Sequence, residues 1–203
     1  MAYFPHHLSH AANAFYTSPH KNSLIVTVDG GGNRPLSFQA DDGTIKRVTV
    51  PESLTINWGE GTNISSFPHF QKKLFLDGLA EANHPDLLVR SLNLGKTWNN
   101  VTNAVFGLSI GYPKGNQAGT VMAMATLGDP KYLDLFNDTM WDPCNPNYNV
   151  LAEYAAQSEE EGFNVAASLQ KYTENTFFDI IAPYIEETKC DTICFSGGVS
   201  LTL

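Results

Sequence analysis

The sequence predicts a mixed α/β fold, and three observations lead to this prediction. Residues 23–28 form a continuous apolar run bounded by turn residues, which is typical of a buried strand. Residues 36–50 alternate between apolar and polar side chains around an Asp-Gly pair at 42–43, the pattern of a β-hairpin. From residue 67 onward apolar side chains recur mainly at helical spacing, until residues 192–195 form another short strand. Strand, hairpin, helices and strand in this order indicate a mixed sheet with packed helices.

The first elements are predicted from local signals. Residues 6–15 are rich in alanine and predict a helix that closes at Ser18-Pro19. The strand at 23–28 is expected to end at Asp29, where Gly30 to Gly32 would form a glycine turn. Further helices are predicted over residues 67–82 and 101–110, and the small side chains of 118–125 allow close helix packing.

The last part of the chain predicts a helix, a strand and a second glycine turn. Three glutamates at 159–161 mark a helix start, because negative charge complements the helix dipole there. Apolar residues then recur at helical intervals as far as Pro183, where a kink or stop is expected. The strand at 192–195 leads into Gly197 and Gly198. Ligands of open α/β sheets gather at the carboxyl ends of strands, so both glycine turns are candidate ligand sites.

Composition limits the classes of function. With 42% apolar and only 16% charged residues, the 203-residue chain is expected to be globular. Its net charge is −9 and it has no run of Lys and Arg, so no nucleic-acid partner and no anionic membrane surface are expected. An anionic ligand would instead be held by metal and backbone amides. No apolar stretch is long enough to span a membrane, three cysteines are too few for a disulfide framework, and a cytoplasmic protein is expected.

Two histidines near the N-terminus are candidate metal ligands. His6 and His10 are four residues apart, so on a helix they share one face and their imidazoles can reach one ion. Asp29, after a strand, can add an oxygen ligand, and the adjacent glycines allow phosphate oxygens to approach the backbone. Each feature alone is more often a surface coincidence or an ordinary loop. Their combination favours a site for a metal and a phosphate.

Four ordered motifs resemble those of the O-carbamoyltransferases of nodulation-factor and antibiotic biosynthesis. They are the run HHLSHAANAFY at 6–16, the strand into Asp29-Gly30, residues 119–125 with Gly-Asp-Pro at 128–130, and FSGGVSL at 195–201. That family shares the actin-like (ribonuclease H-like) ATPase fold with the hydrogenase-maturation carbamoyltransferase and the enzyme that threonylcarbamoylates tRNA adenosine. The resemblance implies the same fold here, mainly its second lobe at residues 21–203, after a histidine-motif helix at 1–20.

The resemblance also implies a role for each site residue. His6, His10 and Asp29 would bind a divalent metal, usually iron, and the four glycines would approach the phosphates and nucleoside, namely Gly30, Gly31, Gly197 and Gly198. His7 is a candidate general base, with polar packing the favoured alternative. The family passes a carbamoyl group from carbamoyl adenylate to a substrate hydroxyl. Expected ligands are therefore ATP, carbamoyl phosphate and a small-molecule hydroxyl acceptor.

Several departures from the family pattern shape these expectations. Thr120 stands where relatives usually carry a lysine, and Asn33 where an acidic residue is expected. The chain opens at the histidine motif and stops before a downstream aspartate that completes the metal shell in relatives. We therefore expect residues 1–203 to form a single partial domain, inactive alone, binding metal weakly and able to form a homodimer. The alternative is a non-catalytic nucleotide- and metal-binding or assembly module of the same fold.

Overall fold

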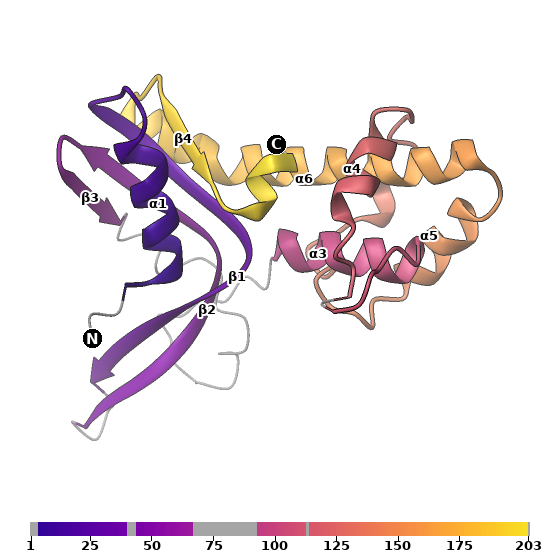
Figure 1. Cartoon of the computed structure of the whole chain (residues 1–203), viewed down its shortest axis with the longest axis horizontal. Coiled ribbons are helices and arrows are strands. Elements are labelled where there is room, and N and C mark those ends of the chain that lie inside the picture. Colours follow the sequence, from indigo (N-terminus) through magenta and orange to yellow (C-terminus); the bar gives the residue numbers. More distant parts are fainter. Residues whose placement is uncertain (1–3, 40–43, 67–92, 113, 203) are drawn as a thin grey trace. The chain divides into compact units, whose positions relative to one another are not determined.

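A computed structural model describes residues 4–39, 44–66, 93–112 and 114–202 (Figure 1). The chain divides into two compact units. The first unit comprises Met1–Asn93 and Tyr184–Leu201, and the second comprises Leu94–Pro183 with Thr202–Leu203. The first unit is built around a sheet, and the described part of the second is helical.

Among the described residues, the sheet of the first unit has four strands in the order β3-β2-β1-β4. These are β1 (Asn22–Gln39), β2 (Ile45–Glu60), β3 (Asn63–Ser66) and β4 (Ile193–Ser196). Strand β1 pairs antiparallel with β2 and parallel with β4, while β3 pairs antiparallel with β2. The predicted mixed sheet is therefore confirmed, including the hairpin, whose arms pair up to Gln39 and Ile45. The Asp-Gly turn predicted at 42–43 lies outside the described residues.

The predicted end of the first strand at Asp29 is wrong. Strand β1 continues to Gln39, and its register with β2 jumps from the pair Val28–Leu54 to the pair Gly32–Glu52. Residues 29–31 therefore oppose a single residue of β2, which makes the glycine run a β-bulge. Glycine lacks a Cβ, so the backbone can loop out locally and resume the ladder. The run Gly30 to Gly32 thus bends a continuous strand and carries Asp29 at the start of the bulge.

Helix α1 (His6–Tyr16) confirms the helix predicted at 6–15. His7, Ala11 and Phe15 are buried at four-residue spacing, so one stripe of the helix packs on the sheet. Ala11 and Phe15 belong to a core cluster with Ile25 and Cys194. A Cβ on Gly59 would lie 2.7 Å from the Phe15 ring, so the ring packs directly on the β2 backbone. This packing fixes the rotation of α1.

The described part of the second unit consists of helices. They are α3 (Leu94–Asn100) continuing into a π-helix (Val101–Val105), α4 (Ala118–Ala125), a short 3-10 helix (Leu133–Leu135), α5 (Asn147–Ala155) and α6 (Glu159–Thr188), whose last turn belongs to the first unit. The Trp98 indole Nε1 donates a buried hydrogen bond to Thr173 Oγ1 at 2.9 Å, which joins α3 to α6. The helix predicted at 101–110 is shorter than expected, and the one at 67–82 lies outside the described residues.

Helix α6 begins at Glu159, as the three glutamates predict, but it does not stop at Pro183. It continues to Thr188, because proline removes one backbone donor and a 30-residue helix keeps the bonds on either side. In the part of the chain that the structure describes, no helix is both long and apolar enough to cross a membrane.

Glu161 of α6 anchors the segment that follows α4. Its carboxylate accepts hydrogen bonds from the Tyr132 hydroxyl at 2.5 Å and the Asn164 amide at 3.0 Å, and it lies 3.5 Å from Lys131 Nζ. The hydrogen bond from Tyr132, the bond from Asn164 and the charge of Lys131 outweigh desolvation and hold the pKa of Glu161 below its ordinary value. The same contact raises the pKa of Tyr132 to about 12.

A lowered carboxyl pKa predicts a contribution to stability that depends on pH. The contribution is complete above the unfolded pKa of about 4.3 and is lost as pH falls through the lower folded value. Between pH 7 and pH 3 we expect the melting temperature of Glu161→Gln to fall less than that of the wild type. The control is Glu160→Gln, which removes a more exposed carboxylate 3.7 Å from Lys131. Equal acid sensitivity of Glu161→Gln and the wild type would contradict this role.

Candidate metal centre

Three side chains predicted as ligands lie together in the first unit. His6 and His10 come from α1, and Asp29 comes from the bulge of β1. His6 Nε2 lies 2.8 Å from Asp29 Oδ2, His10 Nε2 lies 3.4 Å from the same oxygen, and the two Nε2 atoms are 3.2 Å apart. Because one face of α1 packs on the sheet, the adjacent face, which carries His6 and His10, lies next to the bulge. We call these three residues the triad.

The spacing of the triad can be compared with the coordination shell of a small divalent ion. Bonds of roughly 2.0–2.2 Å from nitrogen and oxygen place neighbouring ligands about 3.0 Å apart at right angles and about 3.5 Å apart in a tetrahedron. The three separations of 2.8, 3.2 and 3.4 Å fall close to this range. Two histidines and one carboxylate on one side of an ion leave positions open for other ligands, an arrangement used by non-haem iron. The donor set therefore fits such an ion.

The two oxygens of Asp29 have different partners. Oδ2 faces the histidines, whereas Oδ1 accepts the backbone N–H of Gly30 at 2.8 Å and of Gly198 at 3.2 Å. Desolvation by burial raises the pKa of this carboxyl, but the hydrogen bond from His6, the two backbone bonds and the charge of His10 lower it further, so the net shift is downward. Asp29 is therefore ionised at neutral pH, the form that binds a metal.

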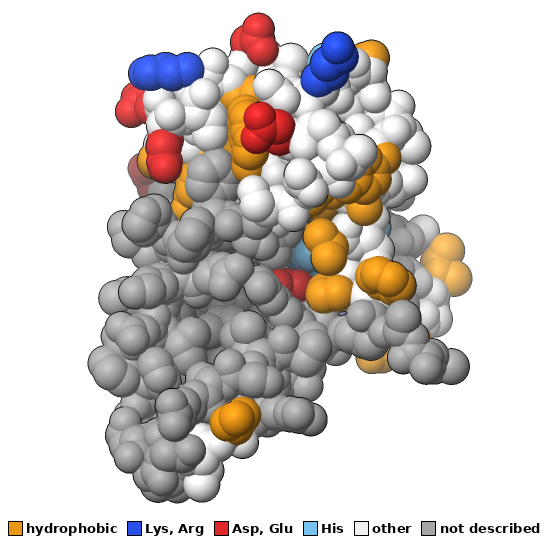
Figure 2. All heavy atoms as spheres, turned by 90° about the vertical axis from the view of Figure 1, so that its left-hand side faces the viewer, with side chains coloured by type: hydrophobic (Ala, Val, Ile, Leu, Met, Phe, Trp, Pro, Cys, Tyr) orange, Lys and Arg blue, Asp and Glu red, His pale blue; other side chains and the backbone are white. Residues whose placement is uncertain are grey.

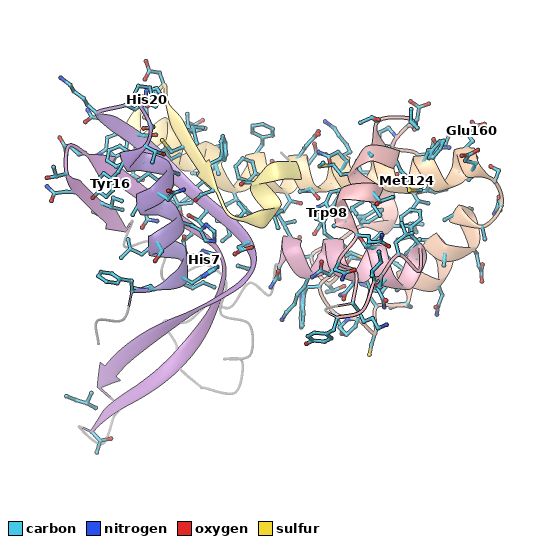
Figure 3. The ribbon with its side chains drawn as sticks, in the orientation of Figure 1. His7, Tyr16, His20, Trp98, Met124 and Glu160 are labelled. Atoms are coloured by element: carbon cyan, nitrogen blue, oxygen red, sulfur yellow. The ribbon has the colours of Figure 1, made fainter. Side chains whose placement is uncertain are left out.

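His7 lies under the triad rather than beside it. Its side chain is only 1% exposed and lies on the side of α1 that faces the sheet (Figure 3). Nδ1 lies 3.1 Å from Thr55 Oγ1, and the buried Nε2 makes no hydrogen bond of standard geometry to any described residue. Desolvation lowers the pKa of His7 to about 4, with Asp29 opposing the shift and the other two histidines adding to it. The imidazole is therefore neutral at physiological pH. Its buried position supports the packing role, and its role as a base stays a prediction.

Gly32 and Asn93 lie at the site although the sequence did not predict a role for them. A Cβ on Gly32 would lie 2.7 Å from the His7 ring and 3.0 Å from the His6 ring, so only glycine leaves room for both imidazoles. The Asn93 side chain is buried, and its Nδ2 lies 3.5 Å from the Gly30 carbonyl. The glycine run indicated that a glycine is needed in this stretch. Only the packing of α1 shows that Gly32 is the one next to the His6 and His7 rings. Asn93 had no signal in the sequence.

The four predicted ligand-binding glycines lie around Asp29. Gly30 and Gly198 donate their N–H groups to Asp29 Oδ1. A ligand near them would therefore benefit from the space left by the missing Cβ. A Cβ on Gly30 or Gly31 would have no atom of the described residues within 4 Å, so the described backbone there is open. Gly197 has φ of +94°, and a Cβ on it would lie 2.2 Å from the Val28 carbonyl oxygen, so this position requires glycine. The chain therefore turns at Gly197, and a short 3-10 helix (Gly198–Thr202) begins at the next residue.

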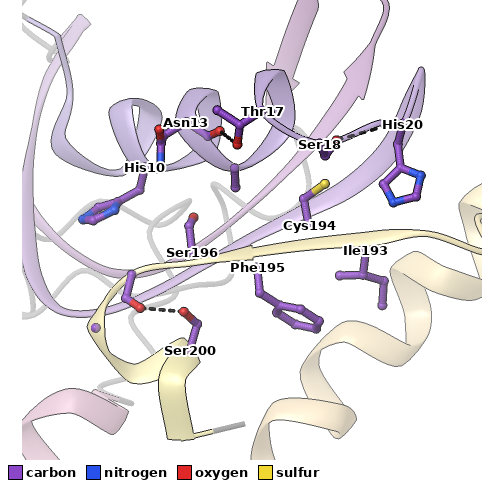
Figure 4. A pocket seen from close by; sticks show the side chains of 13 residues that line it. His10, Asn13, Thr17, Ser18, His20, Ile193, Cys194, Phe195, Ser196 and Ser200 are labelled. Atoms are coloured by element: carbon purple, nitrogen blue, oxygen red, sulfur yellow. Dashed lines mark hydrogen bonds between the residues drawn. The ribbon is translucent and has the colours of Figure 1, made fainter.

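An open hollow of about 690 Å³, lined at one end by His10 of the triad, runs between α1 and β4 (Figure 4). Its walls are one face of α1 with the turn that follows, and β4 with its glycine turn. The lining residues are His10, Asn13, Ala14, Thr17, Ser18, His20, Ile193, Cys194, Phe195, Ser196, Gly197, Gly198 and Ser200. This volume suits a small-molecule ligand.

Among the residues that the structure describes, no Lys or Arg lines the hollow. On the face shown in Figure 2, the basic side chains among the described residues lie at the upper edge rather than in a patch. A phosphate in the hollow would therefore need its charge balanced by a cation at the triad and by backbone or hydroxyl donors.

Comparison with known proteins shows the family to which this chain belongs. The family model described as carbamoyltransferase N-terminus matches residues 1–203, and the chain belongs to this family. The chain is also similar to the uncharacterized protein sll1178 of Synechocystis sp., with 27% identity over 201 residues. The match covers 97% of this chain and 30% of that relative, so the chain spans less than a third of its length.

Proposed function

We propose that this protein forms the metal- and nucleotide-binding part of an O-carbamoyltransferase. The carbamoyl group would pass from carbamoyl adenylate to a hydroxyl of a small molecule. The observation that carries the proposal is the triad, in which His6, His10 and Asp29 meet with the spacing of a coordination shell. The mixed sheet, with one strand parallel to β1 and a helix packed on it, supports an actin-like ATPase lobe as the fold.

The chemistry requires charge stabilisation at a phosphate. The acceptor oxygen forms a bond to the carbamoyl carbon, the bond from that carbon to the phosphate oxygen breaks, and AMP leaves while the hydroxyl proton passes to a base or to solvent. A divalent ion on the triad, with iron the proposed metal, supplies positive charge beside the leaving phosphate. The open backbone at Gly30 and Gly31 and the turn at Gly197 leave room for phosphate oxygens beside Asp29.

Binding of AMP, the leaving group, tests this function. We expect calorimetry to detect AMP binding that requires Mn²⁺ and is absent in Asp29→Asn. Equal AMP binding with and without Mn²⁺, or no binding in either case, would refute a metal-dependent nucleotide site. Carbamoyl transfer by the full-length protein, measured as AMP release with a panel of hydroxyl acceptors, then separates an enzyme from a non-catalytic module that keeps both ligands.

Gly32 allows a test that leaves all three metal ligands in place. In Gly32→Ala the new Cβ would approach the His7 ring to 2.7 Å and the His6 ring to 3.0 Å, so the imidazoles must shift. We expect Mn²⁺ affinity to fall by about tenfold, the lower end of the effect of residues that position metal ligands. The matched control is Gly31→Ala, whose Cβ meets no atom of the described residues within 4 Å. Equal Mn²⁺ affinity in the two variants would show that Gly32 does not position His6.

A further inference from the structure

Asp29 connects two parts of the first unit that are far apart in the sequence. Oδ2 faces His6 and His10 of α1, while Oδ1 accepts the N–H of Gly198, 169 residues further along the chain. The same Oδ1 accepts the N–H of Gly30. One carboxylate therefore faces the proposed metal position with one oxygen and holds the second glycine turn with the other.

The second glycine turn is held closely against β1. Thr27 Oγ1 and Ser196 Oγ are hydrogen-bonded at 2.9 Å, directly before the turn. A Cβ on Gly197 would lie 2.2 Å from the Val28 carbonyl oxygen, and one on Gly198 would lie 3.1 Å from Asp29 Oδ1. The turn therefore lies close to the Val28 backbone at Gly197 and is hydrogen-bonded to the Asp29 carboxylate at Gly198. Neither can move far without displacing the other.

We propose that Asp29 couples metal binding at the triad to the conformation of the Gly197–Gly198 turn, and so to binding of the nucleotide phosphate there. A hydrogen bond that orients a metal-ligating carboxylate contributes to metal affinity. Coupling between two sites is reciprocal, so a turn that strengthens metal binding is itself stabilised by the metal to the same extent. Metal and nucleotide then bind with positive cooperativity. This inference rests on the proposed function, because it takes the triad to be a metal site.

Hydrogen exchange of the wild-type protein tests the coupling without any activity measurement. If the formed turn raises Mn²⁺ affinity about tenfold, bound Mn²⁺ must stabilise the formed turn by the same factor. We therefore expect Mn²⁺ to slow hydrogen exchange of the backbone amides of residues 196–201 by about tenfold. In Asp29→Asn the Oδ1 acceptor remains while a metal-ligating oxygen is lost. Exchange of the turn should therefore be near the metal-free wild-type rate in that variant and should not respond to Mn²⁺.

A variant of the turn tests the reverse direction. Gly198→Ala places a Cβ 3.1 Å from Asp29 Oδ1 and changes no metal ligand, so we expect Mn²⁺ affinity to fall by about tenfold. The control is Gly119→Ala on α4, whose Cβ would have no neighbour within 4 Å in the described part of the chain. If Mn²⁺ binds through His6 and His10 while turn exchange and Gly198→Ala affinity stay unchanged, the coupling is refuted and the metal centre stands. If the wild type binds no Mn²⁺, both proposals fail.

Discussion

Replacing His6 with alanine is expected to lower Mn²⁺ affinity by at least about a hundredfold, since even residues that only position a metal ligand contribute 10- to 100-fold. His6 makes the shortest contact in the triad, 2.8 Å to Asp29, and half of its side chain is exposed, so its removal should leave the core intact. Calorimetric titration of the metal-free protein with Mn²⁺ gives the affinity, and circular dichroism checks that the variant is folded.

The matched control for His6→Ala is His20→Ala. His20 lies in the same hollow as His10, but it is exposed and does not belong to the triad. Its replacement should leave Mn²⁺ affinity unchanged. If both alanine variants bind Mn²⁺ as well as the wild type, the triad is an arrangement of hydrogen-bonded side chains and not a metal site.

The second large effect is expected in Phe15→Ala. The Phe15 side chain is 2% exposed and packs on the backbone of β2 at Gly59, so its truncation should cost about 3–5 kcal/mol of unfolding free energy. The same packing fixes the rotation of α1, so Mn²⁺ affinity should fall as well, although no metal ligand is changed. Chemical denaturation and calorimetry measure the two quantities.

Phe4→Ala is the control for Phe15→Ala. Its side chain is 70% exposed and precedes α1, so we expect a change of less than about 0.5 kcal/mol and normal Mn²⁺ binding. A loss below about 1 kcal/mol in Phe15→Ala would mean that the core collapses around the missing ring, and that α1 is held by other contacts.

The sequence predicted those helices and strands that are marked by residues within the element itself. The four-residue spacing of His6 and His10 placed both on one helix face, and the glutamates at 159–161 marked the start of α6. The glycine run was misread, because a bulge and a turn need the same residue type, and only pairing with β2 separates them. Of the kink or stop expected at Pro183, the stop is wrong, because one lost backbone bond is tolerated in a long helix.

The candidate site was predictable as a set of residues but not as an arrangement. The histidine spacing and the acidic residue before the glycines predicted the triad, because only a few residue types serve as metal ligands. Gly198, in contrast, reaches Asp29 only because β4 pairs with β1 in a particular register, Thr27 opposite Ser196. Asn93 and the contact of Gly32 with two imidazoles also depend on tertiary packing, which has no local signature.

An anomalous-scattering map of crystals grown with Fe²⁺ or Mn²⁺ tests the metal centre most directly. The account predicts a single strong peak within about 2.3 Å of His6 Nε2, His10 Nε2 and an oxygen of Asp29, the distance range of first-row ions. A peak elsewhere, or crystals that contain the ion in solution but show no peak at these three side chains, would contradict it.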